Sequence, residues 1–169
     1  MPRNPLTGDS VITALLDGID SVGAKIMGED NPSFKETLGA SESGNDPTRV
    51  NTLGYMGTWQ FGKARLKDYM EDTGEEFDNE TFLADPKLQS RVFGWHVNNI
   101  HNYITKNNLG SYIGKEINGV PVTLNGLTAV AHLGGNFGMK KFLESGGEYN
   151  PADAYGTSLT DYLNKFKEI

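Results

Sequence analysis

The sequence predicts a mainly α domain with one small β-hairpin. Apolar residues recur every three or four positions along most of the chain, as on the buried face of an amphipathic helix. One Asn-Gly pair, Asn118-Gly119, stands between short β-prone segments and is typical of a two-residue hairpin turn. The chain has 169 residues, of which 37% are hydrophobic, and this suits one domain with a real core.

Helical spacing is interrupted by glycine, proline and acidic segments, which divide the chain into elements. The helices expected from this spacing are Val11–Met27, Pro32 to Glu42 or Ser43, Thr58–Tyr69, Asp85 to about Lys106, Leu124–Leu133, Met139–Leu143 and Ser158–Lys167. Thr48–Gly57 is expected to form a loop or an irregular hairpin. Glu71–Glu80 carries six acidic residues and is expected to be a solvated loop.

Two parts are expected along the chain. Residues 1–30 form a lead-in and an amphipathic helix, and residues 31–169 form the main domain. The first helix belongs either to the core or to a docking surface for a partner, and the core is favoured.

Composition excludes several classes of function. The chain has no cysteine, which rules out disulfides and thiolate metal sites. The histidines His96, His101 and His132 lack the spacing of metal ligands, so neither a metal nor another cofactor is expected, and His96 and His101 are interpreted as structural. The net charge of -7 argues against nucleic-acid binding. No apolar run reaches membrane-spanning length, and no secretory signal is expected at the N-terminus.

The most informative residue is Glu42, which lies at the end of an expected helix. A turn rich in glycine and aromatic residues follows, Gly54-Tyr55-Met56-Gly57-Thr58-Trp59-Gln60-Phe61-Gly62. A carboxylic acid protonates a glycosidic oxygen at neutral pH when an apolar environment raises its pKa. Tyr55, Met56 or Trp59 would provide such neighbours for Glu42.

Three blocks of sequence carry a family resemblance. They are Glu42-Ser43-Gly44, Gly57-Thr58-Trp59-Gln60 and Val130-Ala131-His132-Leu133-Gly134-Gly135. Their order and spacing resemble the lytic transglycosylase and goose-type lysozyme superfamily, whose blocks read roughly Glu-Ser-x-Phe, Gly-Leu-Met-Gln and Ala-Ala-Tyr-Asn-Ala-Gly. The string Gly54–Gly62 also resembles the Gly-Tyr-x-Gly-x-Tyr-Gln-Phe-Gly stretch of phage virion-associated murein hydrolases. The likeness covers roughly residues 34–165.

The resemblance implies a lysozyme-like catalytic domain over residues 31–169 that cleaves the β-1,4 bond between N-acetylmuramic acid and N-acetylglucosamine in peptidoglycan. It implies that Glu42 is the general acid, which then acts as a base. Its implied substrate-binding residues are Ser43, Tyr55, Trp59, Gln60, His132 and Asn136. The alternatives are that Gln60 lies on a helix surface and that Tyr55 and Trp59 belong to the core.

One departure from the family pattern concerns Leu133, where many members carry a glycan-binding asparagine. Either Asn136 takes over that contact or the sugar subsite differs. His132 stands at the position of the family's tyrosine and would donate a hydrogen bond to Glu42 or to the substrate.

The number of carboxylates decides between two reactions. A lytic transglycosylase needs one, because its glutamate activates the substrate's own 6-hydroxyl and a 1,6-anhydro ring closes. A hydrolytic muramidase uses a second acid. Asp46 is the only carboxylate in the adjoining turn, and a role in the turn itself is favoured over catalysis. Transglycosylation is therefore expected ahead of hydrolysis.

Two further alternatives remain. The domain is either an enzyme or a non-catalytic glycan-binding or structural module of a phage tail or injection machine, docked through its N-terminal segment. The glycan is either peptidoglycan or chitin. Many free lysozymes are basic, whereas this chain is acidic, which favours delivery to the periplasm or cell wall by a virion or machine after synthesis in the host cytoplasm.

Overall fold

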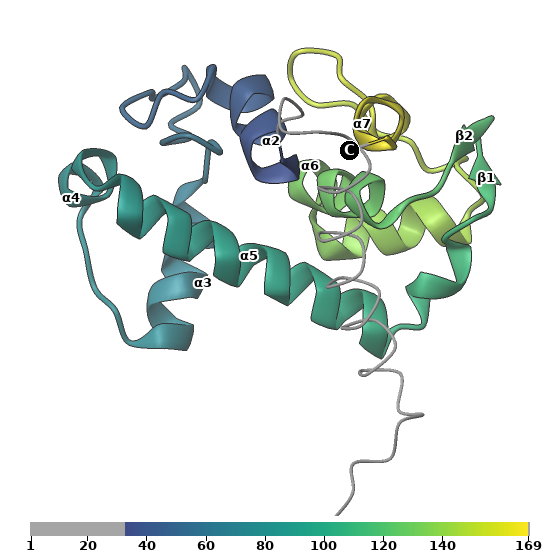
Figure 1. Cartoon of the computed structure of the whole chain (residues 1–169), viewed down its shortest axis with the longest axis horizontal. Helices are drawn as coiled ribbons and strands as arrows, with labels where there is room; N and C mark the ends of the chain where they lie inside the picture. Colours follow the sequence, from purple (N-terminus) through teal and green to yellow (C-terminus); the bar gives the residue numbers. More distant parts are fainter. Residues whose placement is uncertain (1–32, 169) are drawn as a thin grey trace, which may run out of the picture. The chain divides into compact units, whose positions relative to one another are not determined.

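A computed structural model describes residues 33–168 of the chain (Figure 1). This part is mainly helical and contains one two-stranded antiparallel hairpin, which confirms the predicted mainly α class with a small hairpin. Its contacts divide it into two units, residues 33–99 and residues 100–168. Residues 1–30, and with them the expected helix Val11–Met27, lie outside the described residues.

The unit of residues 33–99 is built from α2 (Phe34–Ser43), α3 (Lys63–Thr73), α4 (Asn79–Ala84) and the first part of α5 (Pro86–Lys106). A capping box begins α2: the N–H of Glu36 donates to the Ser33 hydroxyl, and the Glu36 carboxylate accepts from the N–H of Ser33. The helix therefore begins two residues after the predicted Pro32. It ends as predicted, because Gly44 adopts a left-handed φ of 72°.

The helix predicted over Thr58–Tyr69 begins later, at Lys63. The N–H of Met56 donates to the carbonyl of Phe61 at 3.0 Å, and the N–H of Phe61 donates to the carbonyl of Met56 at 2.9 Å. These two bonds close a tight loop, and Gln60 within it has a φ of 54°, which no α-helix contains. The helical spacing of Thr58–Gly62 is therefore coincidental.

The acidic segment Glu71–Glu80 is only in part a loop. The helix α3 continues to Thr73, and α4 begins at Asn79. The Asp78 carboxylate caps α4 by accepting from the N–H of Thr81 at 2.7 Å. The acidic residues at both ends of the segment thus belong to helix termini.

The predicted long helix is confirmed as α5, whose apolar face forms much of the core of residues 33–99. Trp59 stacks on Phe93 with ring centroids 4.5 Å apart. On the same helix, His96 Nδ1 accepts a 2.9 Å hydrogen bond from Arg65 Nε. This contact gives His96 a structural role.

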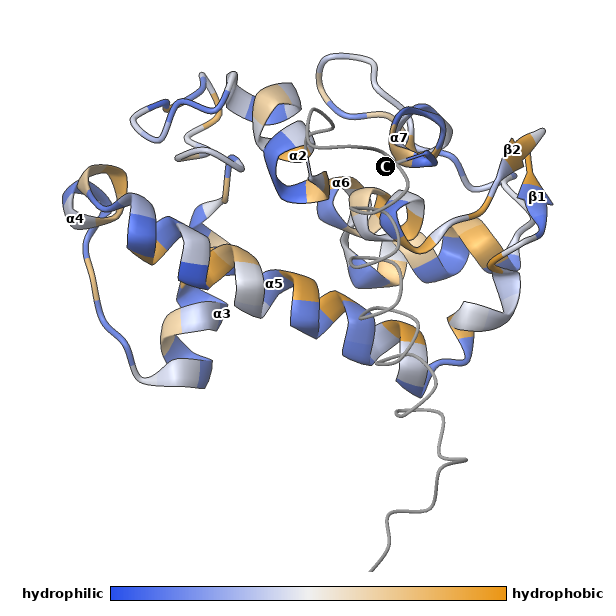
Figure 2. Ribbon diagram, in the orientation of Figure 1, coloured by the Kyte–Doolittle hydropathy of each residue, from blue (hydrophilic) through white to orange (hydrophobic). Residues whose placement is uncertain are grey.

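The unit of residues 100–168 holds the end of α5, the 3₁₀ helix η1 (Leu109–Tyr112), β1 (Glu116–Ile117), β2 (Val120–Pro121), α6 (Leu124–Glu144) and α7 (Leu159–Phe166). The predicted Asn118-Gly119 turn joins the two strands, and both residues have the positive φ that such a turn requires. Figure 2 shows hydrophobic residues along β2 and α6.

The helix α6 joins two segments that the sequence predicts as separate helices. Gly135 lies between them with φ 76° and ψ 166°, which produces a kink rather than an end. Buried Leu159, Leu163 and Phe166 place the apolar face of α7 in the core of this unit. Among residues 33–168, no helix has the length and apolar character needed to cross a membrane.

His101, near the end of α5, is held neutral. The Thr128 hydroxyl donates to the Leu124 carbonyl at 2.8 Å, so it accepts from His101 Nε2 at 3.0 Å. Burial lowers the pKa of His101 from 6.5 to about 4. A structural role for this histidine follows.

We predict that His101 makes folding stability depend on pH. Its folded pKa lies below its unfolded pKa, so the unfolded chain binds more protons between pH 6.5 and about 4. Stability is therefore lost as the pH falls through this window, by at most about 3 kcal/mol. Urea unfolding of the wild type and of His101→Gln at pH 7, 6, 5 and 4.5 measures the loss. The free energy of unfolding of the variant should fall less with decreasing pH than that of the wild type. An equal fall in both proteins would contradict the prediction.

Candidate functional site

Glu42 is the penultimate residue of α2 and is half-buried. The left-handed Gly44 ends the helix two residues later, and the chain enters the loop of residues 44–62, which leads to α3 (Figure 1). The carboxylate therefore lies where a rigid helix meets a loop, as the sequence predicts.

Ser43 joins the end of α2 to this loop. Its buried hydroxyl donates to the carbonyl of Thr58 at 2.7 Å and accepts from the N–H of Asp46 at 3.0 Å. The two partners lie near opposite ends of the loop. Ser43 thus fixes the backbone next to Glu42, and a contact of Ser43 with the substrate stays a prediction.

The outer part of the loop is closed by Asn51. Its side-chain oxygen accepts from the N–H groups of Leu53 and Tyr55, both at 2.9 Å. Its own N–H donates to the carbonyl of Tyr55 at 3.0 Å. This Asx-type turn holds Tyr55 in a fixed place at the surface.

Gln60 lies in the loop before α3, so the alternative of a helix-surface glutamine does not apply. Its side chain is 8% exposed. The amide nitrogen donates to the carbonyl of Gly57 at 2.9 Å and to the carbonyl of Arg49 at 3.2 Å. Gln60 therefore holds the two arms of the loop together, and a contact with sugar stays a prediction.

Trp59 lies in the core. It is 5% exposed, its ring stacks on Phe93, and its Nε1–H donates to the carbonyl of Lys35 at 2.9 Å. The ammonium group of Lys35 lies 5.3 Å from the ring centroid. These contacts favour the core alternative over a sugar-stacking role.

Tyr55, by contrast, is 43% exposed. Its ring packs against Gly62, where an added Cβ would lie 3.0 Å from Tyr55 Cε1. The ring borders a surface hollow of about 560 Å³. Other residues that line this hollow are Val50, Leu53, Met56, Lys63 and Leu83. An exposed aromatic ring with a fixed backbone is suited to stacking on a sugar.

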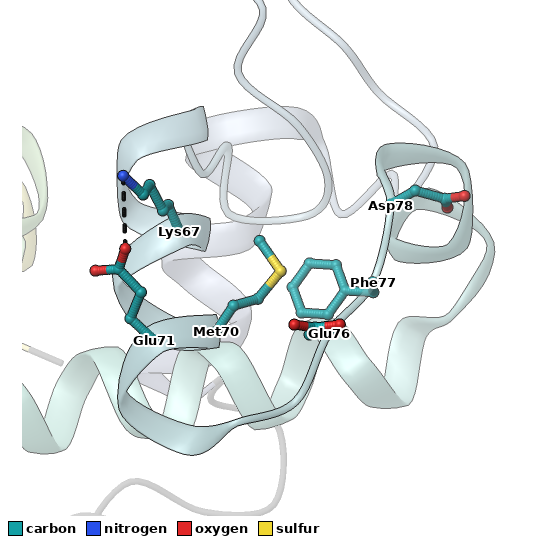
Figure 3. A pocket seen from close by; sticks show the side chains of 6 residues that line it. All are labelled: Lys67, Met70, Glu71, Glu76, Phe77 and Asp78. Atoms are coloured by element: carbon teal, nitrogen blue, oxygen red, sulfur yellow. Dashed lines mark ion pairs between the residues drawn. The ribbon is translucent and has the colours of Figure 1, made fainter.

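A second hollow, of about 590 Å³, lies beside α3 and the segment that leads to α4. Figure 3 shows the side chain of Met70 next to the ring of Phe77, and Lys67 paired with Glu71 at 3.5 Å. Glu76 and Asp78 add two further carboxylates to the lining. This lining is therefore mainly acidic, whereas the residues that line the hollow beside Tyr55 include no carboxylate.

Asp46 is engaged in its own turn. Its carboxylate accepts from the N–H of Thr48 at 2.9 Å and from the Thr48 hydroxyl at 2.7 Å. These hydrogen bonds lower the pKa of Asp46. This geometry fits the favoured role of Asp46 as a turn residue.

His132 and Asn136 belong to the other unit, in α6. His132, Leu133 and Asn136 are half-buried, and they lie on either side of the kink at Gly135. A shared site with Glu42, Ser43, Tyr55 and Gln60, all in residues 33–99, stays a prediction.

Gln89 is a residue of this region that the sequence analysis misses. It lies in the first turns of α5 and is 0% exposed. Its side chain bonds to the backbone at Thr58, Pro47 and Phe82. The available signal is the helical position of Gln89 on the same face as the apolar residues Leu88 and Val92. A buried amide on such a face must be satisfied by specific partners.

Among residues 33–168, no group of three or more histidine and carboxylate side chains is arranged to hold a metal ion. No protein-family model, no curated protein and no solved structure matches the chain. Its function is therefore inferred from its residues and from the resemblance of its motifs.

We predict that Gly57→Ala destabilises the protein much more than Gly54→Ala. Both glycines have a similar positive φ, 81° at Gly57 and 86° at Gly54, so both changes place an alanine in the left-handed region. An added Cβ at Gly57 would lie 2.6 Å from Gln89 Oε1, whereas one at Gly54 meets nothing within 4 Å. We expect a loss of about 1 kcal/mol for Gly54→Ala and about 2 to 4 kcal/mol for Gly57→Ala.

Urea unfolding at neutral pH measures the free energy of unfolding of both variants against the wild type. Equal losses would show that the Gln89 side chain moves away from an added methyl group without cost. The close packing of Gly57 on Gln89 would then make no measurable contribution to the free energy of unfolding.

Proposed function

We propose that the chain is a peptidoglycan-cleaving enzyme with a lysozyme-like fold, in which Glu42 is the catalytic acid and base. The observation that carries the proposal is the position of Glu42 at the end of α2, beside a loop fixed by Ser43 and Gln60. The order of the three motif blocks supports it. The mainly helical architecture is compatible with such a fold.

The proposed reaction is lytic transglycosylation. Glu42 donates its proton to the leaving glycosidic oxygen as the bond to the anomeric carbon of the muramic acid breaks. The 6-hydroxyl oxygen of the same sugar then bonds to that carbon, and its proton passes to Glu42. The carboxylic acid is regenerated, and the products are a 1,6-anhydro end and a free 4-hydroxyl. One carboxylate is sufficient for this cycle.

The engagement of Asp46 by Thr48 supports transglycosylation over hydrolysis. A second catalytic acid must orient a water molecule or face the developing cation. The Asp46 oxygen that accepts both Thr48 hydrogen bonds is already used within the turn. The hydrolytic muramidase stays the alternative, as does a binding module without turnover.

We predict that Glu42→Gln abolishes the release of soluble muropeptides from purified murein sacculi. Loss of a general acid costs about 10²- to 10⁴-fold in rate. The matched control is Glu71→Gln, which removes the same charge from an exposed residue of the same unit and should leave the rate unchanged. Mass spectrometry of the products identifies anhydro-muramyl ends for a transglycosylase and reducing ends for a muramidase.

Sedimentation with sacculi separates the enzyme from the binding module. Glu42→Gln should still sediment with the sacculi while releasing no muropeptides. A wild-type protein that sediments equally well and releases none would contradict the enzyme and favour the module. Cleavage of chitin oligomers but not of murein would contradict peptidoglycan as the substrate and favour chitin.

We predict that Asp46→Asn keeps the rate within about threefold of the wild type, because an amide oxygen still accepts the Thr48 hydrogen bonds that hold the turn. Muropeptide release by the purified variant is the measurement. A loss comparable to that of Glu42→Gln would identify Asp46 as a second catalytic carboxylate and favour hydrolysis.

A further inference from the structure

The side-chain amide of Gln89 forms its hydrogen bonds with backbone groups of other segments. Its Nε2 donates to the carbonyl of Pro47 at 2.8 Å and to the carbonyl of Phe82 at 2.9 Å. Its Oε1 accepts from the N–H of Thr58 at 2.9 Å. Both donor hydrogens and one acceptor site are thus satisfied in a place that excludes solvent.

The two loop partners of Gln89 bracket the segment that follows Glu42. Pro47 lies at its beginning and Thr58 near its end. The carbonyl of Thr58 in turn accepts the Ser43 hydroxyl at 2.7 Å. A continuous path of hydrogen bonds and peptide units therefore runs from Gln89 in α5 to Thr58, and from Thr58 to Ser43, which is the residue next to Glu42.

The packing around Gln89 is specific to its shape. Gly57 approaches so closely that an added Cβ would lie 2.6 Å from Oε1 and 2.9 Å from the side-chain carbon Cδ. The α5 scaffold is a helix of 21 residues, which is more rigid than the loop that it holds. The side chain therefore transfers the rigidity of α5 to the loop.

We propose that Gln89 is a positioning residue for Glu42. This inference rests on the proposed function. By fixing both ends of the 47–58 segment, Gln89 holds the end of α2 so that the carboxyl group reaches the leaving oxygen and then the 6-hydroxyl. A misplacement of about 1 Å lowers a rate by about 100-fold. With Glu42 displaced, water competes with the 6-hydroxyl, and the share of reducing ends among the products rises.

The test uses two variants of the full chain. Gln89→Met keeps the length of the side chain and removes all three hydrogen bonds. Gln89→Glu keeps an acceptor for the N–H of Thr58 and, when ionised, loses both donors. The control is Thr128→Val, which removes a buried hydroxyl with two hydrogen bonds from the other unit. Circular dichroism sets a temperature at which each variant is fully folded.

We expect Gln89→Met to lower kcat by about 10- to 100-fold with KM within about twofold, and to raise the fraction of reducing ends. Thr128→Val should keep the wild-type kcat and product ratio. The product ratio does not depend on how much protein is folded, so lost stability alone cannot change it. If Gln89→Met does not fold, Gln89→Glu gives the same comparison.

The outcomes separate the two proposals. A wild type that releases no muropeptides overturns the proposed function and this inference with it. An active wild type whose folded Gln89 variants match Thr128→Val in kcat and product ratio overturns the inference alone. An active wild type with a lowered kcat and more reducing ends in the Gln89 variants supports both.

Discussion

The candidate site depends on hydrogen bonds between buried side chains and loop backbone. One of them joins the hydroxyl of Ser43, the residue next to Glu42, to the carbonyl of Thr58. A loop of this length has many backbone groups that would otherwise need water. Ser43, Gln60 and Gln89 satisfy several of them from within. An unsatisfied buried polar group costs about 1 to 3 kcal/mol, so the bonds select one loop conformation over its competitors.

The sequence predicts the elements whose signals are local. The 3.6-residue spacing is sufficient for α5 and α7, and the Asn118-Gly119 pair predicts the hairpin turn, because neighbouring residues determine these structures. The start of α3 is not predicted, because the residues just before Lys63 also have helical spacing. In the structure, the backbone pairing of Met56 with Phe61 holds them in a loop instead. The end of a helical pattern, the turn rich in glycine and aromatic residues that follows it and the order of the motif blocks together predict Glu42 as a candidate acid. The contacts of Gln89 join segments far apart in sequence, and no single-sequence pattern encodes them.

Many of the acidic residues stabilise local structure. Asp78 and Asp161 cap helices, and hydrogen bonds from nearby N–H groups and hydroxyls lower the pKa of each. Hydrogen bonds from Arg91 and Tyr69 likewise lower the pKa of Glu75. The net charge of -7 is therefore in part a consequence of how the helices are capped and connected. A chain of this charge has no general electrostatic attraction to an anionic polymer.

The loop divides into a fixed base and an exposed tip, and the two suit different parts of the proposed reaction. The base contains Gln60 and Trp59 and is bound by Ser43 at the end of α2, and the buried contacts of all three residues leave little freedom. General acid catalysis needs this rigidity, because a proton moves only between atoms within hydrogen-bonding distance. The tip exposes Tyr55 and Leu53 while Asn51 holds their backbone. Sugar stacking needs an accessible face more than a buried one, so the same loop can hold an acid in place and still offer a surface to a polymer.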